Sequence, residues 1–434
     1  MPRHFALPAC LVLAIPFAHA DNNQAVSSAT GFNPQISLIL DGNIYHDNQN
    51  GGGAGLLEEM AGIGHGAAAH GHGHGGLENG FNLGESELVM SAVVDPYFDG
   101  KLTLTVGGDG ATALEESWLQ TRQLPAGLKV KMGKFLSEIG YQNNQHPHAW
   151  DFADQNLAYM GILGDHGLMD AGVQLSWVAP TPFYALFGIE ALQGNDQEKF
   201  GTLIENADTV DLVTAAITDP LPEHRGGPRL TTAFLKLAPD LGDVHALQVG
   251  LSFAKARQFQ QIIDEDGTAQ SSDEYALDGD QTLTGLDLVY KRDSAGEYGA
   301  GDFKLAAEYL RLKKTMTVTA ADAGSPLAMG DKVDGLQDGY YLQASYGIAP
   351  RWQIGLRHDV NGDTNELVEA GAKVAFQSSQ RQTLALSFHP SEFSRLRLQA
   401  AQGDIYDETG AKTALKQIFL QYTHSLGPHG AHKF

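Results

Sequence analysis

The sequence predicts an all-β protein, a closed antiparallel transmembrane β-barrel of about sixteen strands with long extracellular loops. Apolar and polar residues alternate with a period of two in many segments, and no helical segments separate them. Short turns, mostly with proline, alternate with long polar connections. Bacterial outer-membrane barrels show this asymmetry between their two ends, whereas a globular domain rarely tolerates so many long loops.

The N-terminus has the three parts of a secretory signal peptide. Arg3 and His4 give a short basic start, residues 5–18 are apolar, and Ala18-His19-Ala20 fits the small-x-small cleavage pattern. The apolar stretch is too short for a spanning helix. The expected organisation is a cleaved signal peptide (1–20), a short periplasmic segment (21–33) and an outer-membrane barrel (34–434).

The composition excludes several classes of protein. Cys10 lies in the signal peptide, so the mature chain has no cysteine for a disulfide, a thiolate metal site or a nucleophile. The net charge is −24, and removing Arg3 with the signal peptide makes it −25, which argues against nucleic acid as a partner. Enzyme motifs such as G-x-S-x-G and H-E-x-x-H are absent from the sequence, so we expect no enzyme. A barrel hydrolase with scattered catalytic residues would leave no such motif and stays an alternative.

Period-two alternation defines the strands. In 35–45, for example, Ile36, Leu38, Leu40 and Ile44 share one face. Strands are expected at 34–45, 85–95, 100–108, 113–122, 127–136, 172–179, 183–193, 230–238, 245–259, 285–292, 302–316, 339–348, 351–360, 381–389, 394–403 and 414–426. This even number, sixteen, returns both termini to the periplasm, and a hairpin within the ambiguous segment 361–380 would raise it to eighteen.

Aromatic residues support the barrel. They fall on the outward parity at the expected periplasmic ends of the strands, where a membrane barrel carries an aromatic girdle: Trp177, Phe183, Trp352, Phe388 and Tyr422. A soluble sandwich has no reason to collect outward aromatic side chains at one end.

Three stretches carry a family resemblance: NQHPHAWDF in the long insertion of 127–177, HPSEFSRLRLQ at 389–399 and SLGPHGAHKF at 425–434. They resemble a family of proteobacterial outer-membrane proteins often described as zinc-regulated or TonB-dependent outer-membrane receptors, which is distantly similar to the phosphate-selective porins. The resemblance covers most of the mature chain and implies metal-related transport across the outer membrane. A TonB-dependent receptor has an N-terminal plug domain, and residues 21–33 are too few for one, which favours a porin-like protein.

The first long loop, 46–84, is rich in histidine and glycine. Its GHGAAAHGHGHGG stretch contains His65, His70, His72 and His74. Neutral imidazole is a good ligand for zinc, copper and nickel, and glycine lets the backbone bend around an ion. We expect weak, exchangeable metal capture there, with a flexible low-complexity loop as the alternative.

The third long loop, 137–171, follows the fifth expected strand. By analogy with sixteen-stranded porins, we expect it to fold inward and constrict the pore. Within it, His146, His148 and Asp151 could present two nitrogens and one oxygen to a divalent cation. The alternative, which we favour, is a rigid HPHAWDF turn that holds the loop against the wall.

Strand parity also gives a candidate pore lining of charged side chains: Lys129, Lys131, Arg357, Arg395, Arg397, Glu85 and Glu87. Charged walls set pore selectivity, although a wet lumen also tolerates charge without using it. The fifth loop, 261–284, is acidic, and a solvated loop is a simpler interpretation than divalent cations bridging it to lipopolysaccharide.

These observations favour a porin-like channel or receptor for small solutes that takes part in zinc uptake. No cofactor is expected, and zinc would be a ligand or the transported ion. The expected partners are outer-membrane lipid, lipopolysaccharide, and small solutes or divalent metal ions, and a homo-oligomer stays open. A general diffusion porin with no metal role and a closed-barrel surface or adhesion protein are the alternatives.

Overall fold

A computed structural model describes residues 34–63, 77–108, 110–194, 197–204, 221–263, 275–407 and 409–427. The predicted signal peptide, the segment 21–33 and the four histidines of the first loop lie outside these residues. Residues Pro34–Phe434 form one unit, which is described by itself here.

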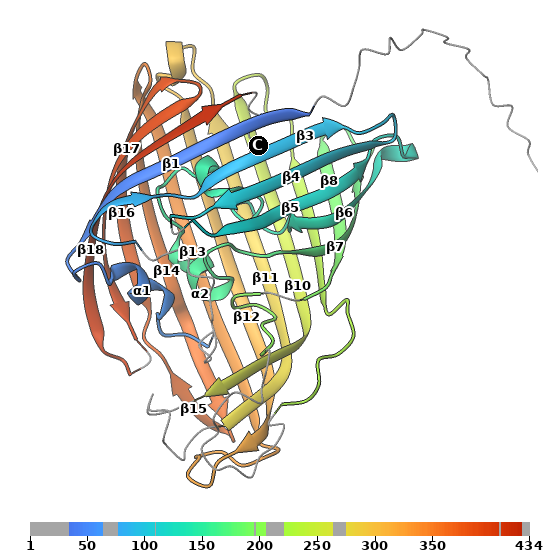
Figure 1. Ribbon diagram of the computed structural model, residues 1–434, viewed down its shortest axis with the longest axis vertical. Coiled ribbons are helices and arrows are strands. Elements are labelled where there is room, and N and C mark those ends of the chain that lie inside the picture. The colour runs from blue at the N-terminus through green and yellow to red at the C-terminus, as the bar shows by residue number, and fades with distance from the viewer. Residues whose placement is uncertain are drawn as a thin grey trace, which may run out of the picture. The chain divides into compact units, whose positions relative to one another are not determined.

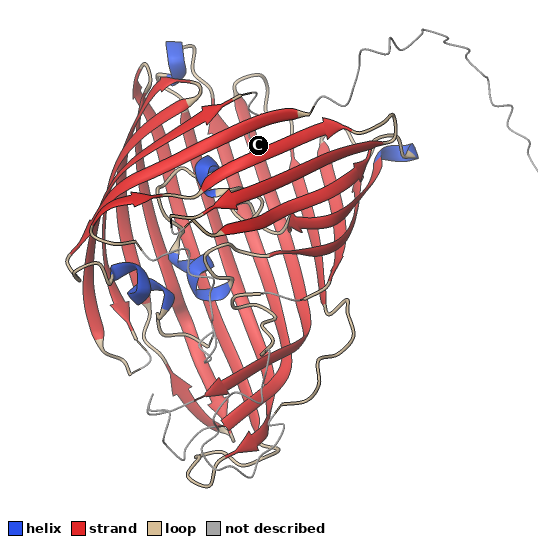
Figure 2. Ribbon diagram, viewed as in Figure 1, coloured by secondary structure: helices blue, strands red, loops and turns tan. Residues whose placement is uncertain are grey.

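The unit is a closed antiparallel barrel (Figures 1 and 2). Its strands are β1 (Gln35–Asp47), β2 (Gly80–Leu83), β3 (Ser86–Val93), β4 (Phe98–Val106), β5 (Thr112–Thr121), β6 (Leu128–Leu136), β7 (Met169–Val178), β8 (Tyr184–Leu192), β9 (Leu230–Ala238), β10 (His245–Ile263), β11 (Tyr275–Arg292), β12 (Phe303–Ala321), β13 (Lys332–Ala349), β14 (Trp352–Glu369), β15 (Ala372–Ala375), β16 (Ser379–Ser391), β17 (Ser394–Tyr406) and β18 (Lys412–Leu426). Two short helices, α1 (Gly53–Glu58) and α2 (Leu157–Ile162), lie in the connections.

Closure is made by β1, which pairs with β18 on one side and with β2 and β3 on the other. Because β2 and β3 both pair with β1, one after the other along its length, they occupy a single strand position in the barrel. The short strand β15 pairs with the C-terminal end of β14. The eighteen strands therefore make a sixteen-stranded barrel with two additional short strands, as the sequence predicts.

The structure corrects the predicted ends of several strands, which are longer than expected on the side of the long loops. Strand β11 begins at Tyr275, ten residues before the expected 285, and β13 begins at Lys332 instead of 339. The connections expected at 261–284 and 317–338 are correspondingly shorter. The ambiguous segment 361–380 continues β14 and forms a hairpin between β14 and β15. Because β14 also pairs directly with β16, this hairpin adds no further strand position around the barrel.

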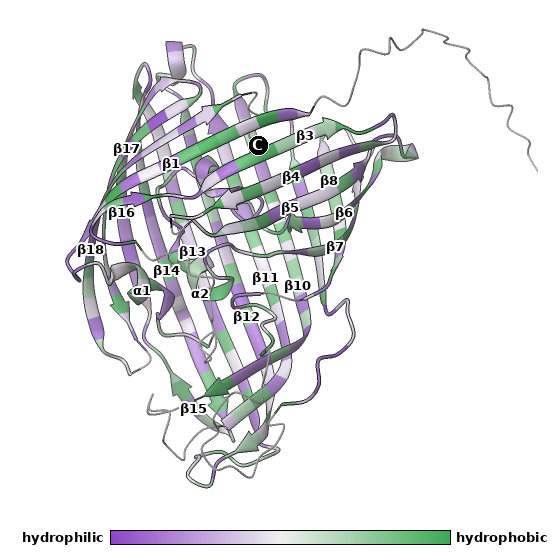
Figure 3. Cartoon of the chain, viewed as in Figure 1, coloured by the Kyte–Doolittle hydropathy of each residue, from purple (hydrophilic) through white to green (hydrophobic). Residues whose placement is uncertain are grey.

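The outer surface of the barrel is apolar. Along each strand, hydrophilic and hydrophobic residues alternate (Figure 3). Leu175, Leu384 and Leu420 are 44%, 48% and 38% exposed, while the neighbouring Gln174 and Gln421 are buried inside. Trp177 and Trp352 are likewise exposed on the outside. An apolar exterior over a polar interior is the arrangement of a lipid-facing barrel. Among the described residues, no helix is long and apolar enough to cross a membrane.

Two bulges interrupt the regular alternation on one wall. On β4 and β5, Thr103 lies opposite Glu116 and Leu104 lies opposite Leu114, so Glu115 has no partner residue. A second irregularity separates β2 from β3, around Gly84 and Glu85. A bulge inserts an extra residue and turns consecutive side chains towards one face. Both bulges lie on the wall of short strands, β3 to β8, seen at the front of Figure 1.

Candidate functional site in the barrel lumen

The third loop, 137–168, is folded into the barrel. Its backbone amides at Tyr141 and Gln142 donate to the carboxylate of Glu308 on β12, at 2.9 and 2.7 Å. Helix α2 lies in this loop and packs against β13 and β14. The amide of Leu157, at the start of α2, donates to Asp359 at 3.1 Å. The wall strands thus supply acceptors for a loop backbone that would otherwise lose its hydrogen bonds on burial.

Asp154 attaches the middle of the loop to the wall. Its carboxylate accepts from Arg357 at 2.9 Å and from Arg381 at 2.7 Å, and Gln399 donates to it at 2.8 Å. Both guanidinium groups are buried. Bidentate or paired arginine contacts to a carboxylate are among the stronger polar interactions in proteins.

Arg395 and Arg397 on β17 bind the loop through its carbonyl groups. Arg397 donates to the carbonyl oxygen of Trp150 at 2.7 Å, and Arg395 donates to those of Trp150 and His148 at 3.0 Å each. Arg357, Arg395 and Arg397, three of the residues expected to line the pore, therefore contact the loop inside the barrel. Their partners lie about two hundred residues or more away in the sequence, at separations of 203 to 247.

The predicted lysines lie on β6. Lys131 is buried, with its Nζ 3.6 Å from a carboxylate oxygen of Glu138 and over the ring of Trp118. Lys129 shares its parity near the start of the strand and is exposed.

The loop places two histidines beside acidic residues of β3 and β5. His146 Nδ1 lies 2.9 Å from Glu115 Oε2 and 3.7 Å from Glu87 Oε2, and its Nε2 lies 3.0 Å from Glu116 Oε2. His148 Nδ1 lies 2.6 Å from Glu87 Oε1. The segment 146–150 therefore links the acidic wall at β3 and β5 to the arginines of β17.

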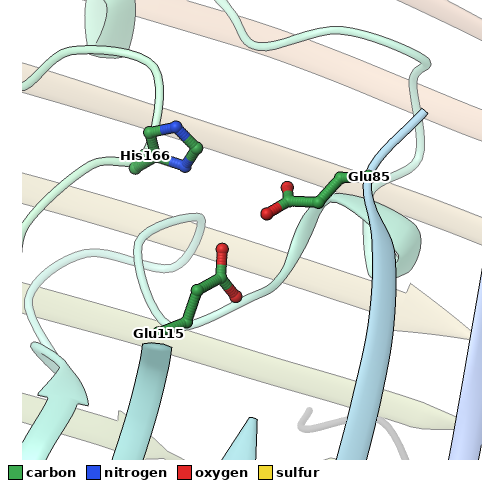
Figure 4. A group of neighbouring side chains, drawn as sticks. All are labelled: Glu85, Glu115 and His166. Carbon is green, nitrogen blue, oxygen red and sulfur yellow. The ribbon is translucent and has the colours of Figure 1, made fainter. Parts of the chain in front are cut away.

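A second group shares Glu115. Glu85, Glu115 and His166 each offer one atom, and these atoms all lie within 4.8 Å of one another, as do those of Glu87, Glu115 and His146. Figure 4 shows the side chains of Glu85, Glu115 and His166 pointing towards a common space. His166 comes from the end of the in-folded loop, while the two acids come from the wall.

The structure separates the three residues that the sequence grouped as metal ligands. His146 and His148 lie together, with their rings stacked at 6.0 Å, whereas Asp151 accepts from Lys304 at 2.6 Å and from Gln343 at 2.9 Å. The other members of the predicted set, His65, His70, His72 and His74, lie outside the described residues.

Sequence reasoning missed Glu115 and Glu116. Regular alternation directs only one of two consecutive residues inward, and the bulge at Glu115 turns both acids inward, where each is buried. The available signal was the adjacent acidic pair itself, because a lipid-facing carboxylate in a strand is unfavourable.

Three groups of the loop, His146, Asp151 and Asp154, have shifted pKa values. Burial alone would lower the pKa of His146, but Glu87, Glu115 and Glu116 outweigh it and raise the pKa to about 10. Burial would raise the pKa of Asp151 and of Asp154. Lys304 outweighs this for Asp151, and Arg381 and Arg357 outweigh it for Asp154, so that both pKa values lie below their usual range.

A closed antiparallel barrel with an apolar exterior and an in-folded third loop belongs to the fold class of the outer-membrane β-barrels. The chain matches the outer-membrane channel DcaP of Acinetobacter baumannii with a TM-score of 0.53 at 12% identity, over 92% of this chain and 99% of that one. It matches OmpT of Vibrio cholerae, as a loop L8 deletion mutant and in a trimer form, with a TM-score of 0.50 at 11% and 10% identity, over 91% of this chain and 99% of each.

In sequence, the chain belongs to the family of an uncharacterized protein of Aquifex aeolicus (strain VF5). The two are 34% identical over 412 residues, which is 94% of this chain and 81% of that protein. No family model matches the chain.

Proposed function

We propose that the protein is an outer-membrane channel for small solutes, of the porin type. The observation that carries the proposal is the in-folded loop 137–168, held in the lumen of a closed barrel by the ion pairs of Asp151 and Asp154. A loop fixed in this way narrows a lumen without filling it with an independent domain. Charged side chains on the wall and on the loop would then select among the solutes that pass.

We also propose that zinc or a similar divalent cation is among these solutes. Two features support this finer proposal: the histidine-rich stretch 64–76 of the first loop, and the carboxylate and imidazole groups that converge in the lumen. Imidazole and carboxylate together are a common ligand set for zinc. A general diffusion porin would need neither feature.

Planar-bilayer recording of the purified full chain tests the channel. We expect discrete ion-conducting steps, and zinc added to one side should change the current, because a cation that binds in the lumen slows the passage of others. A protein that inserts but conducts no ions would contradict the proposal and favour a closed-barrel surface protein. Conduction that is indifferent to zinc would leave a general diffusion porin.

Uptake by proteoliposomes tests the finer proposal. Vesicles that contain the protein and a fluorescent zinc indicator should fill with zinc faster than protein-free vesicles and faster than vesicles with a heat-unfolded sample. Equal rates in all three preparations would contradict zinc transport while leaving the conductance result to stand alone.

A further inference from the structure

We propose that Glu87, Glu115 and His146 form a divalent-cation site inside the barrel, and that Glu85 and His166 extend it on the other side of Glu115. The inference rests on the proposed function, because it names the place in the lumen where a permeating cation is held. It differs from the set that the sequence suggested, since Asp151 is bound elsewhere and the two wall acids of β5 and β3 take its place.

The spacing of the ligand atoms fits one small cation. Zinc binds nitrogen and oxygen at about 2.0–2.2 Å, so two ligands of a tetrahedral ion lie about 3.4 Å apart. His146 Nδ1 lies 2.9 Å from Glu115 Oε2 and 3.7 Å from Glu87 Oε2, on either side of that spacing. Small side-chain rotations therefore suffice to place an ion among the three groups.

Three buried carboxylate oxygens of the group have no hydrogen-bond partner within the described part of the chain: Glu85 Oε1, Glu87 Oε2 and Glu115 Oε2. Glu87 is 1% exposed, and its Oε1 contacts His148, but within the described part of the chain its Oε2 has no hydrogen-bond partner. Buried polar atoms are rarely left unpaired, and an unpaired charged oxygen is especially unfavourable. Because Oε2 points towards His146 and Glu115, a cation among them would satisfy it.

The balance of charge also favours a cation. Four carboxyl groups converge on this part of the wall: Glu85, Glu87, Glu115 and Glu116. Lys101 contacts Glu116. Glu116 belongs to neither three-residue group, so Lys101 does not neutralise Glu85, Glu87 or Glu115 through this contact. An imidazolium at His146 would compensate one carboxylate, and that state is the competing explanation which the experiment below separates from metal binding.

The site depends on the barrel wall and the loop together. The two bulges turn Glu85 and Glu115 inward, and the in-folded loop supplies His146 and His166. A bound cation would therefore join the loop to the acidic, short-stranded wall, while Arg395 and Arg397 join it to β17. Nitrogen ligands favour zinc over magnesium, which prefers oxygen donors.

Zinc titration calorimetry on the full chain in detergent tests the site. The starting protein carries asparagine at the four first-loop positions (His65→Asn, His70→Asn, His72→Asn and His74→Asn), so that the histidine-rich stretch contributes no binding. We expect this protein to bind zinc and to bind magnesium much more weakly. Adding Glu115→Gln, which alters the shared ligand with little change in shape, should weaken zinc binding at least tenfold, equivalent to about 1.4 kcal/mol.

The matched control is Glu190→Gln. Glu190 is also buried in the lumen, but its carboxylate is already satisfied by Gln174, Thr232 and the amide of Glu138. Glu190→Gln, added to the same starting protein, should leave the zinc isotherm unchanged. Folding of each variant is checked by the mobility difference between heated and unheated samples on gels, and His146→Gln replaces Glu115→Gln if the latter does not fold.

The outcomes are distinct from those of the channel test. A starting protein that binds no zinc, or a Glu115→Gln variant that binds it equally well, would overturn the site and leave His146 as the imidazolium of a salt-bridge cluster. Zinc binding at this site in a protein that conducts no ions would overturn the channel while leaving the site in place.

Discussion

Asp154 is the residue on which the position of the loop depends most directly. Its carboxylate faces two buried guanidinium groups, Arg357 and Arg381. Replacing it by asparagine keeps its shape but leaves both cations with Asp359 as their one remaining carboxylate among the described residues. Removing one partner of a buried ion pair costs about 3–5 kcal/mol. Because Asp359 still pairs with both arginines, we expect Asp154→Asn to lower the free energy of unfolding by about 3 kcal/mol, the lower end of that range, measured by urea unfolding in detergent micelles.

The control for this variant is Asp334→Asn. Asp334 lies on β13 and is exposed, so loss of its charge should change the free energy of unfolding by no more than about 0.5 kcal/mol. Equal unfolding midpoints for the two variants would show that the loop is held by its apolar contacts and not by Asp154.

At this scale, the sequence predicted the direction of side chains better than their partners. Parity alone places Arg357, Arg395 and Arg397 inside, because a strand has a fixed period of two. It does not reveal that they bind carbonyl groups of a loop more than two hundred residues away. It also fails at Glu115, where a bulge breaks the period. Contacts that depend on tertiary folding and on local irregularity are outside what alternation encodes.

The in-folded loop should respond to acid as a unit. Asp151 and Asp154 have pKa values below their usual range because Lys304, Arg357 and Arg381 stabilise the ionised forms. A depressed pKa in the folded state gives stability that is present above the unfolded value, about 4, and is lost as the pH falls through the folded value. The contribution of Asp151 and Asp154 to loop attachment should thus be constant from pH 7 to about 4 and weaken below it.

Single-channel conductance between pH 7 and pH 3 measures this response. We expect the conductance to rise or become unsteady only below about pH 4, as the loop detaches. Asp154→Asn should show the same behaviour already at neutral pH. A transition centred near pH 6 would instead assign control of the loop to a group other than these two aspartates.

The strands make a separate prediction about the lipid-facing surface. Leu384 on β16 is 48% exposed on the outside of the barrel, and Leu384→Arg should reduce barrel stability by about 2–4 kcal/mol if it lies near the bilayer midplane. Leu241 is 44% exposed but lies in the turn between β9 and β10, where arginine can reach water. Leu241→Arg should therefore cost about 0–1 kcal/mol in the same refolding titration into lipid vesicles. Similar losses at both positions would contradict the assignment of the membrane band.

The strand limits show why an element can be recognised and its ends missed. The apolar alternation that defines β11 is clear from residue 285 onward, and the structure extends the strand back to Tyr275. The added part contains Asp278 and Asp280, so no outward apolar series marks it. Pairing with β10 and β12 maintains it as a strand. Beyond the membrane, neighbouring strands rather than lipid determine where a strand ends.

At the scale of the whole molecule, the sequence predicts a closed barrel, and the pairing of β1 with β18 closes it. An open sheet of this length would leave two unpaired edges, which promote aggregation and cannot exist in a bilayer. Because the number of strands around the barrel is even, the first and last strands pair in antiparallel register, with Leu40 opposite His424 and Ile44 opposite Leu420.

Cysteine cross-linking tests that closure directly. The sequence has a single cysteine, Cys10, in the predicted signal peptide, so engineered pairs can be interpreted without interference. Facing residues of antiparallel strands have Cα atoms about 4.5–5.5 Å apart, within the range of a disulfide. Leu40→Cys with His424→Cys should therefore oxidise to a disulfide across the seam. The boiled, unreduced chain would then be circular over residues 40–424 and should migrate faster on gels than the reduced chain.

Leu40→Cys with Leu420→Cys is the control for register. Leu420 pairs with Ile44, four residues along β1, which is about 13 Å from Leu40 at a rise of about 3.3 Å per residue. This separation exceeds the reach of a disulfide, so the second pair should remain reduced under the same oxidation. Equal cross-linking of both pairs would mean that the seam slides or opens, and a barrel with such a seam could not hold the loop, its ion pairs and the acidic wall in one fixed arrangement.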